Sequence, residues 1–332
     1  MQPYQNQPQY VQVQDQGQYY LQQQQPQQFQ QYQNQPPQQQ YQQIQTQQVQ
    51  YPGQLPQQQQ QLYSNVTPQQ QVFQSIPQTT AATLVPTIDL ESFRAKYEIK
   101  ASHIPVLQNL IRYRAILICD DSGSMNELAD NDTNSPITRW AELQKMVKII
   151  IEGHAAVGSY CDIYFINRPG VLHVTDWNQC AHLFAPPPSG STNTCRVLQQ
   201  IQQHEVGTDM GKPIIIHLLT DGHPTDDAGR ENHTQLENMI INRKFQTKTF
   251  FSVVLCTDDE EVDKMYRRLE STAGVDLSMN YRGERKEILE IRGSRYPFSF
   301  GDYATKVMVG SFDKTLHDID KPQLLSCACI IS

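Results

Sequence analysis

The sequence predicts an α/β protein with a doubly wound, mostly parallel sheet, helices on both faces and a disordered Gln-rich tail in front. Between residues 113 and 318, short apolar runs that suit buried strands alternate with amphipathic helical patterns. Polar clusters follow several of these runs, as in sheets that bind ligands beyond the carboxyl ends of their strands. Residues 1–84 are different: 38 of the first 80 residues are Gln, and Asp15 is their sole charged residue.

Each element is predicted from its own pattern. Residues 85–112 form a lead-in segment in which apolar residues recur at helical spacing. The turn at residues 168–170 makes the strand that follows it an edge strand of a hairpin. We expect strands at residues 115–119, 163–166, 171–174, 214–219 and 250–255, and helices at residues 140–157, 193–203, 231–245, 260–271 and within 302–316. Strands alternating with helices in this way favour a parallel sheet that is covered on both faces.

Composition excludes several classes of protein. The net charge of −8 and the lack of a block of Lys and Arg argue against a nucleic-acid-binding protein. No apolar run approaches the roughly 20 residues that span a bilayer, and the first residues do not resemble a signal peptide. Seven Cys without a CxxC pair suggest a reducing compartment, with Cys119, Cys161 and Cys256 as small buried apolar residues.

The sequence contains three polar clusters, two directly after predicted strands and one directly before a predicted helix. Because the carboxyl ends of parallel strands lie at one edge of a sheet, we expect all three clusters to meet at that edge. They contribute Asp120, Ser122 and Ser124 after the first strand, Thr192 before a helix, and Asp221 after another buried strand. Two carboxylates and three hydroxyls are hard oxygen ligands, which suit Mg²⁺, Mn²⁺ or Ca²⁺. We therefore predict a divalent metal site at this edge of the sheet.

This set of residues resembles the metal-ion-dependent adhesion site of von Willebrand factor type A domains. The order Asp120-x-Ser122-x-Ser124, then Thr192, then Asp221 matches that pattern, and the resemblance covers about residues 113–318. It implies that the two Ser and Thr192 bind the ion directly or nearly so. It further implies that the two Asp bind directly or through water, and that an Asp or Glu of a protein partner completes the site.

The last residues carry a second motif. Cys329-Ile330-Ile331-Ser332 resembles a prenylation box whose terminal Ser favours a farnesyl group. A single prenyl chain gives only marginal membrane attachment, so Cys327 is a candidate for a second, palmitoyl chain. An unmodified Cys327 stays open as the alternative. Residues 319–332 are accordingly expected to be a lipidated tail.

Together these patterns predict a metal-dependent protein-binding module, not an enzyme, held by lipid on the cytoplasmic face of a membrane. The tract at residues 1–84 combines Gln with spaced Tyr, a composition associated with weak self-association. Two other functions stay open at this point: a metal-assisted hydrolase that uses the same ion, and a scaffold or condensate protein that depends on the Gln-rich tail.

Overall fold

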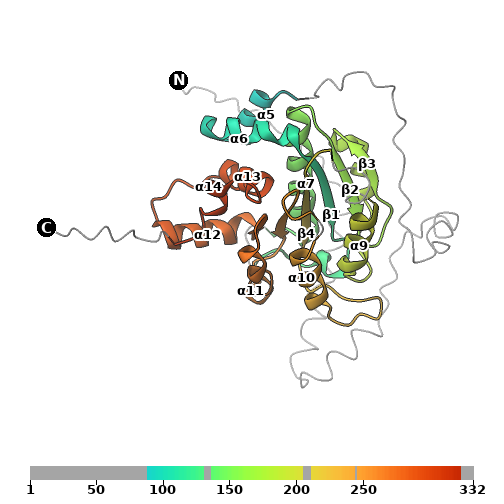
Figure 1. Cartoon of the computed structure of the whole chain (residues 1–332). Helices are drawn as coiled ribbons and strands as arrows, with labels where there is room; N and C mark the ends of the chain where they lie inside the picture. Colours follow the sequence, from blue (N-terminus) through green and yellow to red (C-terminus); the bar gives the residue numbers. More distant parts are fainter. Residues whose placement is uncertain (1–87, 131–135, 205–210, 244, 323–332) are drawn as a thin grey trace, which may run out of the picture. The chain divides into compact units, whose positions relative to one another are not determined.

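The computed structural model describes residues 88–130, 136–204, 211–243 and 245–322 (Figure 1). Its six-stranded sheet has the order β3-β2-β1-β4-β5-β6, and all neighbouring pairs are parallel except β2 and β3. The strands are β1 Arg114–Cys119, β2 Cys161–Phe165, β3 Val171–Val174, β4 Ile214–Thr220, β5 Thr249–Leu255 and β6 Val275–Ser278. The predicted α/β class with a mostly parallel sheet is confirmed, and β3 is the antiparallel edge strand.

Two apolar layers enclose the sheet, because alternate residues of each strand point to opposite faces. In β1, Leu117 and Cys119 belong to one buried cluster, whereas Ile116 and Ile118 belong to the other. All four side chains are fully buried, which explains why the strand is a continuous apolar run.

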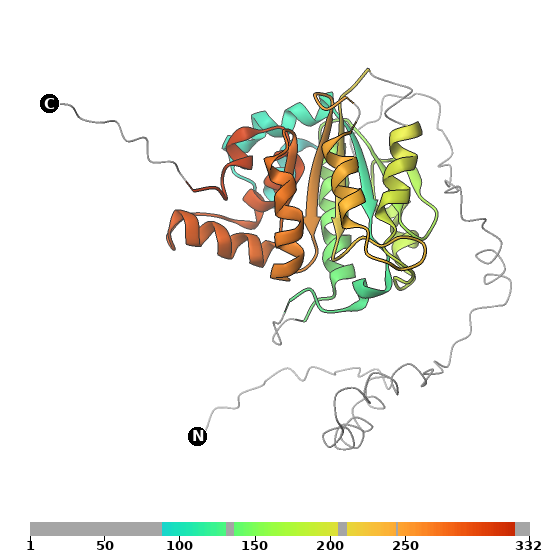
Figure 2. The same ribbon diagram turned by 60° about the horizontal axis from the view of Figure 1, so that its bottom comes forward.

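Helices cover both faces of the sheet (Figures 1 and 2). The first layer contains α5 Leu90–Lys96, α6 Ile104–Gln108, α7 Arg139–Ala156 and α13 Phe300–Val309, and the second contains α9 Thr194–His204, α10 His233–Ile241 and α11 Glu260–Arg267. The remaining helical elements are α8 Ala181–Phe184, α12 Tyr281–Arg292 and α14 Lys314–His317, with 3-10 turns η1 Ala101–His103, η2 Asn109–Arg112, η3 Gly123–Asn126, η4 Trp177–Gln179 and η5 Arg268–Ser271. Within the described ranges, no helix is long and apolar enough to cross a bilayer.

Besides the one-turn helix α8, the structure contains a strand and a longer helix that the sequence patterns did not predict, β6 and α12. It also divides the helix expected within residues 302–316 into α13 and α14, because the chain leaves the helix after Val309. The helix expected at residues 231–245 is shorter, since α10 ends at Ile241. The Gln-rich tail, Cys327 and Cys329 lie outside the described residues.

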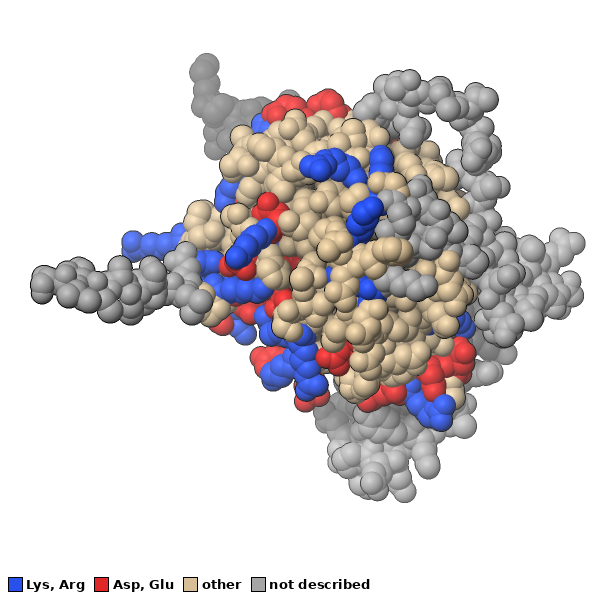
Figure 3. Space-filling model, viewed as in Figure 1, with Lys and Arg blue, Asp and Glu red and all other residues tan. Residues whose placement is uncertain are grey.

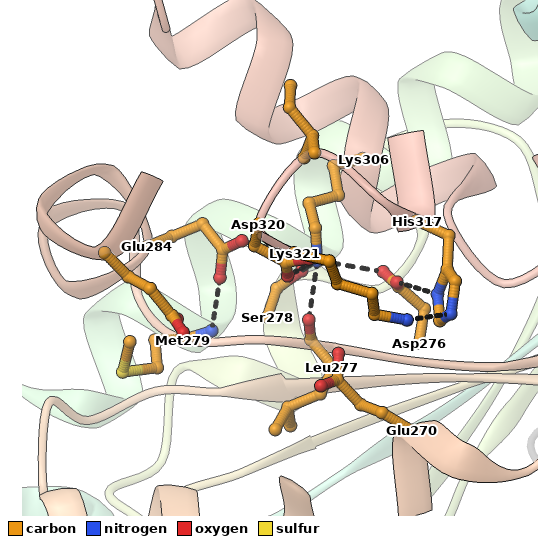
Figure 4. Close-up of polar contacts among 12 residues, drawn as sticks. Glu270, Asp276, Leu277, Ser278, Met279, Glu284, Lys306, His317, Asp320 and Lys321 are labelled. Carbon is orange, nitrogen blue, oxygen red and sulfur yellow. Dashed lines mark hydrogen bonds and ion pairs between the residues drawn. The ribbon is translucent and has the colours of Figure 1, made fainter. Parts of the chain in front are cut away.

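A buried ammonium group holds β6 and α12 together (Figure 4). Lys306 of α13 is fully buried, and its Nζ lies 3.2 Å from Asp276 of β6 and 3.3 Å from Glu284 of α12. The same Nζ is 3.1 Å from Asp320, which follows α14. One cation therefore joins β6, α12, α13 and the segment that ends the described chain.

Candidate metal centre

The loop after β1 is fixed by one of its own carboxylates. Asp120 is fully buried, and its Oδ1 accepts a hydrogen bond from the Ser122 backbone N–H at 3.0 Å. Its Oδ2 accepts one from Thr220 Oγ1 at 2.6 Å. Because Thr220 is the last residue of β4, these bonds connect the ends of two neighbouring parallel strands.

A row of oxygen atoms crosses this edge of the sheet. Ser122 Oγ lies 3.1 Å from Ser124 Oγ, and Ser124 Oγ donates to Asp221 Oδ1 at 3.1 Å. The structure thus brings together four of the five predicted residues, although Asp221 is almost a hundred positions along the chain from Ser124.

Thr192 reaches the same edge through main-chain contacts. Its N–H donates to Thr225 Oγ1 at 3.1 Å, and its carbonyl accepts from the Thr225 N–H at 2.8 Å. The loop that carries it also contacts the first loop, since the Gly123 N–H donates to the Gly190 carbonyl at 3.1 Å. Gly190 has a φ of +106°, and a Cβ there would lie 2.7 Å from the Asn167 side chain. This loop therefore needs glycine at its point of closest approach.

Asp121 has a different task from Asp120. Its Oδ2 lies 2.6 Å from Arg168 Nε, and its Oδ1 accepts from the Asn167 backbone N–H at 2.8 Å. The Arg168 guanidinium also donates to main-chain carbonyls of residues 183, 186 and 187. Burial raises the pKa of Asp121, and Arg168 opposes that shift. This ion pair therefore positions the loop beside the oxygen row, and Asp121 itself is not part of the row.

The two site carboxylates share a desolvated environment. Burial, followed by the charge of Asp221, raises the pKa of Asp120 to about 7. Burial, followed by the charges of Asp120 and Asp221, also raises the pKa of Tyr266, whose hydroxyl donates to the Gly222 carbonyl at 3.2 Å. The carboxylates at this edge are therefore poorly solvated by water when they are ionised. A bound cation would stabilise their negative charge.

Arg139 is a site residue that the sequence patterns did not reveal. Its Nη1 lies 2.8 Å from Asp221 Oδ2 and 3.1 Å from Glu127 Oε2. Within the described chain, its buried Nε has no hydrogen-bond partner. Arg139 is the first residue of α7, whose N-cap is Thr138. The one feature of the sequence that could have drawn attention to Arg139 is this position at the start of a helix. It places one positive charge against Asp221 on the side away from Ser124.

The donor set fits a hard divalent cation. In an octahedral Mg²⁺ site with metal–oxygen distances of about 2.0–2.1 Å, neighbouring oxygens lie about 2.8–3.0 Å apart. The two spacings of 3.1 Å along the oxygen row are close to that edge length. No group of three or more His, Cys, Asp or Glu side chains suited to a metal occurs in the described ranges. The set here differs in kind, because hydroxyls supply three of its five oxygen-bearing side chains.

Comparisons with known proteins assign neither a family nor a function to the chain. No family model matches the chain, and no curated protein matches it. Among solved structures, the pilus adhesin SpaC of Lactobacillus rhamnosus GG is similar, with a TM-score of 0.39 and 15% sequence identity. The match covers 59% of this chain and 30% of the adhesin chain.

Proposed function

We propose that this protein is a divalent-metal-dependent binding module of the von Willebrand factor type A kind, which recruits a partner through an acidic side chain. Asp120, Ser122, Ser124, Thr192 and Asp221 would hold Mg²⁺ or Mn²⁺. When bound, the ion would supply a positive centre for a carboxylate of the partner. The observation that carries the proposal is the row of oxygens from Ser122 through Ser124 to Asp221, 3.1 Å apart at each step.

The chemistry of the row favours binding over hydrolysis. Its hydroxyls are neutral ligands, so an ion held mainly by them would keep much of its positive charge for an incoming anion. In this proposal the carboxylates of Asp120 and Asp221 both bind the ion, directly or through water, and both hydrogen-bond to neighbouring residues of the site. Neither is then available in this cluster as a general base, the group that a metal-assisted hydrolase needs to activate water.

We also propose that a lipid on Cys329 tethers the module to the cytoplasmic face of a membrane, with Cys327 as the site of a second, reversible acyl chain. The support is the tetrapeptide Cys329-Ile330-Ile331-Ser332. Mass spectrometry of the C-terminal peptide from eukaryotic cells tests it directly. An unmodified Cys329 at full occupancy would contradict the tether.

Metal titration tests the binding module. A ligand that binds only the folded state stabilises it, by about 2.7 kcal/mol at a concentration a hundred times its Kd. We expect Mg²⁺ or Mn²⁺ to raise the melting temperature of chelator-treated protein, and Ser122→Ala with Ser124→Ala to abolish the rise. Ser102→Ala with Ser294→Ala, at two exposed positions, is the matched control and should keep it. An unchanged melting temperature together with no binding heat in calorimetry would refute the metal site.

The partner is identified by comparing cells that carry the wild type with cells that carry Asp221→Ala. Proximity labelling should recover partners whose capture requires Asp221, and chelator should release them from purified complexes. Partners captured equally by both forms would mean that recognition does not pass through the ion.

A further inference from the structure

Helix α12 presents cationic side chains to solvent along one side. Arg282, Arg285 and Lys286 are exposed, and their spacing places them on one face of the helix. On the opposite face, Glu284 and Ile288 are buried. We refer to Arg282, Arg285 and Lys286, together with the exposed Arg295 three residues beyond the end of the helix, as the α12 basic face.

Much of this charge is uncompensated. Arg282 is 3.5 Å from Asp130, but its side chain is still 55% exposed. Arg285, Lys286 and Arg295 have no ion-pair partner in the part of the chain that the structure describes. A surface hollow of roughly 740 Å³ lies against the helix, and its lining contains three basic side chains, those of Arg282, Arg285 and Lys286, and one acidic side chain, that of the exposed Glu290. Figure 3 shows Lys and Arg side chains gathered on this side of the molecule, although Asp and Glu are interspersed.

The described chain ends next to this helix. Arg292, the last residue of α12, donates from Nε to the Ile319 carbonyl at 2.8 Å and from Nη2 to the Asp318 carbonyl at 2.5 Å. The buried carboxylate of Asp320 forms an ion pair with Lys306 (Figure 4). The described part of the chain ends two residues later, at Pro322 (Figure 1). The last described residues, 318–322, therefore lie beside the C-terminal turn of α12, the helix that carries most of the basic face.

The length of that segment keeps the helix near any membrane that holds Cys329. Cys329 is seven positions along the chain from Pro322, so their Cα atoms are at most about 25 Å apart. Helix α12 has 12 residues and is about 18 Å long. A lipid on Cys329 would thus hold the exit point, and the helix with it, within a short distance of the lipid headgroups.

We propose that the α12 basic face is a membrane-docking surface that binds the anionic headgroups of a phosphatidylserine-type bilayer. The proposal that this surface meets a membrane in the cell rests on the proposed lipid on Cys329. The binding of the surface to anionic headgroups needs no lipid on the protein. One prenyl chain is a marginal anchor, and each Lys or Arg near an anionic surface strengthens binding roughly fivefold. The basic face would therefore be a second attachment signal, built into the fold.

The test uses the full chain made in bacteria, where Cys329 carries no prenyl group, and flotation with vesicles in chelator at about 50 mM salt. We expect binding to vesicles with about 30 mol% phosphatidylserine, loss of that binding at high salt, and none to pure phosphatidylcholine. Arg285→Gln, Lys286→Gln and Arg295→Gln together should weaken the partition about a hundredfold, at roughly fivefold for each charge.

A second triple variant separates this face from net charge. Lys212→Gln, Arg230→Gln and Lys264→Gln remove three charges at exposed positions outside α12, and should change the partition less than about twofold. Equal losses in both triples, or no binding of the wild type at millimolar phosphatidylserine, would overturn the docking surface. Salt-sensitive binding to an acidic peptide or an oligonucleotide without binding to vesicles would overturn it as well. None of these outcomes depends on whether Cys329 is prenylated in cells.

Discussion

At the scale of single residues, Asp120 determines how the candidate centre responds to pH without metal. Its pKa is raised to about 7, so its contribution to stability is full below about pH 4 and is lost as the pH rises through 7. Above that pH the folded protein carries an ionised Asp120 that is buried beside Asp221.

Asp120→Asn should therefore stabilise the metal-free protein at pH 8, by about 2 kcal/mol, because it removes a buried charge beside Asp221. The gain should shrink at pH 5, where Asp120 is largely protonated in the folded state. The amide oxygen can still accept a hydrogen bond from the loop. Chemical denaturation in chelator at both pH values measures the difference, and Mg²⁺ should no longer stabilise the variant. Destabilisation at pH 8 would show that the bonds to Asp120 outweigh its charge.

The site residues differ in how far sequence could predict them. Asp120, Ser122, Ser124 and Asp221 follow strands whose apolar runs are easily recognised, and the structure places them in contact. Their role as metal ligands stays a prediction. Arg139 could not be assigned to the site in the same way, because its contact with Asp221 spans 82 positions and depends on how α7 docks.

At the scale of elements, the five apolar or hairpin strands were predictable and β6 was not. Strand β6 has the sequence Val-Asp-Leu-Ser, which alternates like a half-exposed strand or a loop, yet all four residues are buried. Asp276 and Ser278 are buried because both contact Lys306, on α13, rather than water. Helix α12 was missed for a similar reason, since its charged pattern hides a buried Glu284.

The next prediction concerns the Lys306 cluster, which contains the buried Lys306 and its ion-pair partners Asp276, Glu284 and Asp320. Glu270 belongs to the same cluster, because it interacts electrostatically with Lys306 and Asp320 (Figure 4). Burial raises the pKa of Glu270 to about 7 and that of Glu284 to about 8, so the cluster contributes less stability as the pH rises from about 5 to about 8. Lys306→Met leaves buried carboxylates without their cation and should destabilise by about 3–5 kcal/mol at pH 8. The loss should be smaller at pH 5, where Glu270 and Glu284 are protonated.

Two variants control this experiment. Glu284→Gln should flatten the decline of stability with pH, because one of the two titrating carboxyl groups is removed. Lys264→Met changes a Lys side chain that is 71% exposed, and should alter stability by less than about 0.5 kcal/mol. Equal destabilisation of Lys306→Met at pH 5 and pH 8 would mean that lost packing, rather than unbalanced charge, explains the effect.

At the scale of the whole molecule, α12 connects the two proposed functions. Near its start, Asn280 donates to the Ala129 carbonyl at 3.3 Å and Arg282 lies 3.5 Å from Asp130, in the segment that follows the metal loop. At its end, Arg292 binds the carbonyls that precede the tail. One helix thus extends from the neighbourhood of the metal edge to the exit of the proposed lipid anchor.

The tether makes the prediction at this scale. Cys329→Ser should release most of the protein from membranes, because a second acyl chain on Cys327 needs the prenyl group to bring the tail to the bilayer. The α12 basic face binds without lipid, but salt at cellular concentration weakens that contact. Cys327→Ser should keep the prenyl group and shift the protein partly to internal membranes and cytosol, since one chain anchors weakly. Residues added after Ser332 should reproduce Cys329→Ser, because the box is read at the chain end. Fractionation and imaging of cells that express each form give the comparison, with Ser102→Ala as the neutral control. Full membrane retention of Cys329→Ser would exclude prenylation as the anchor and leave the basic face to explain any attachment.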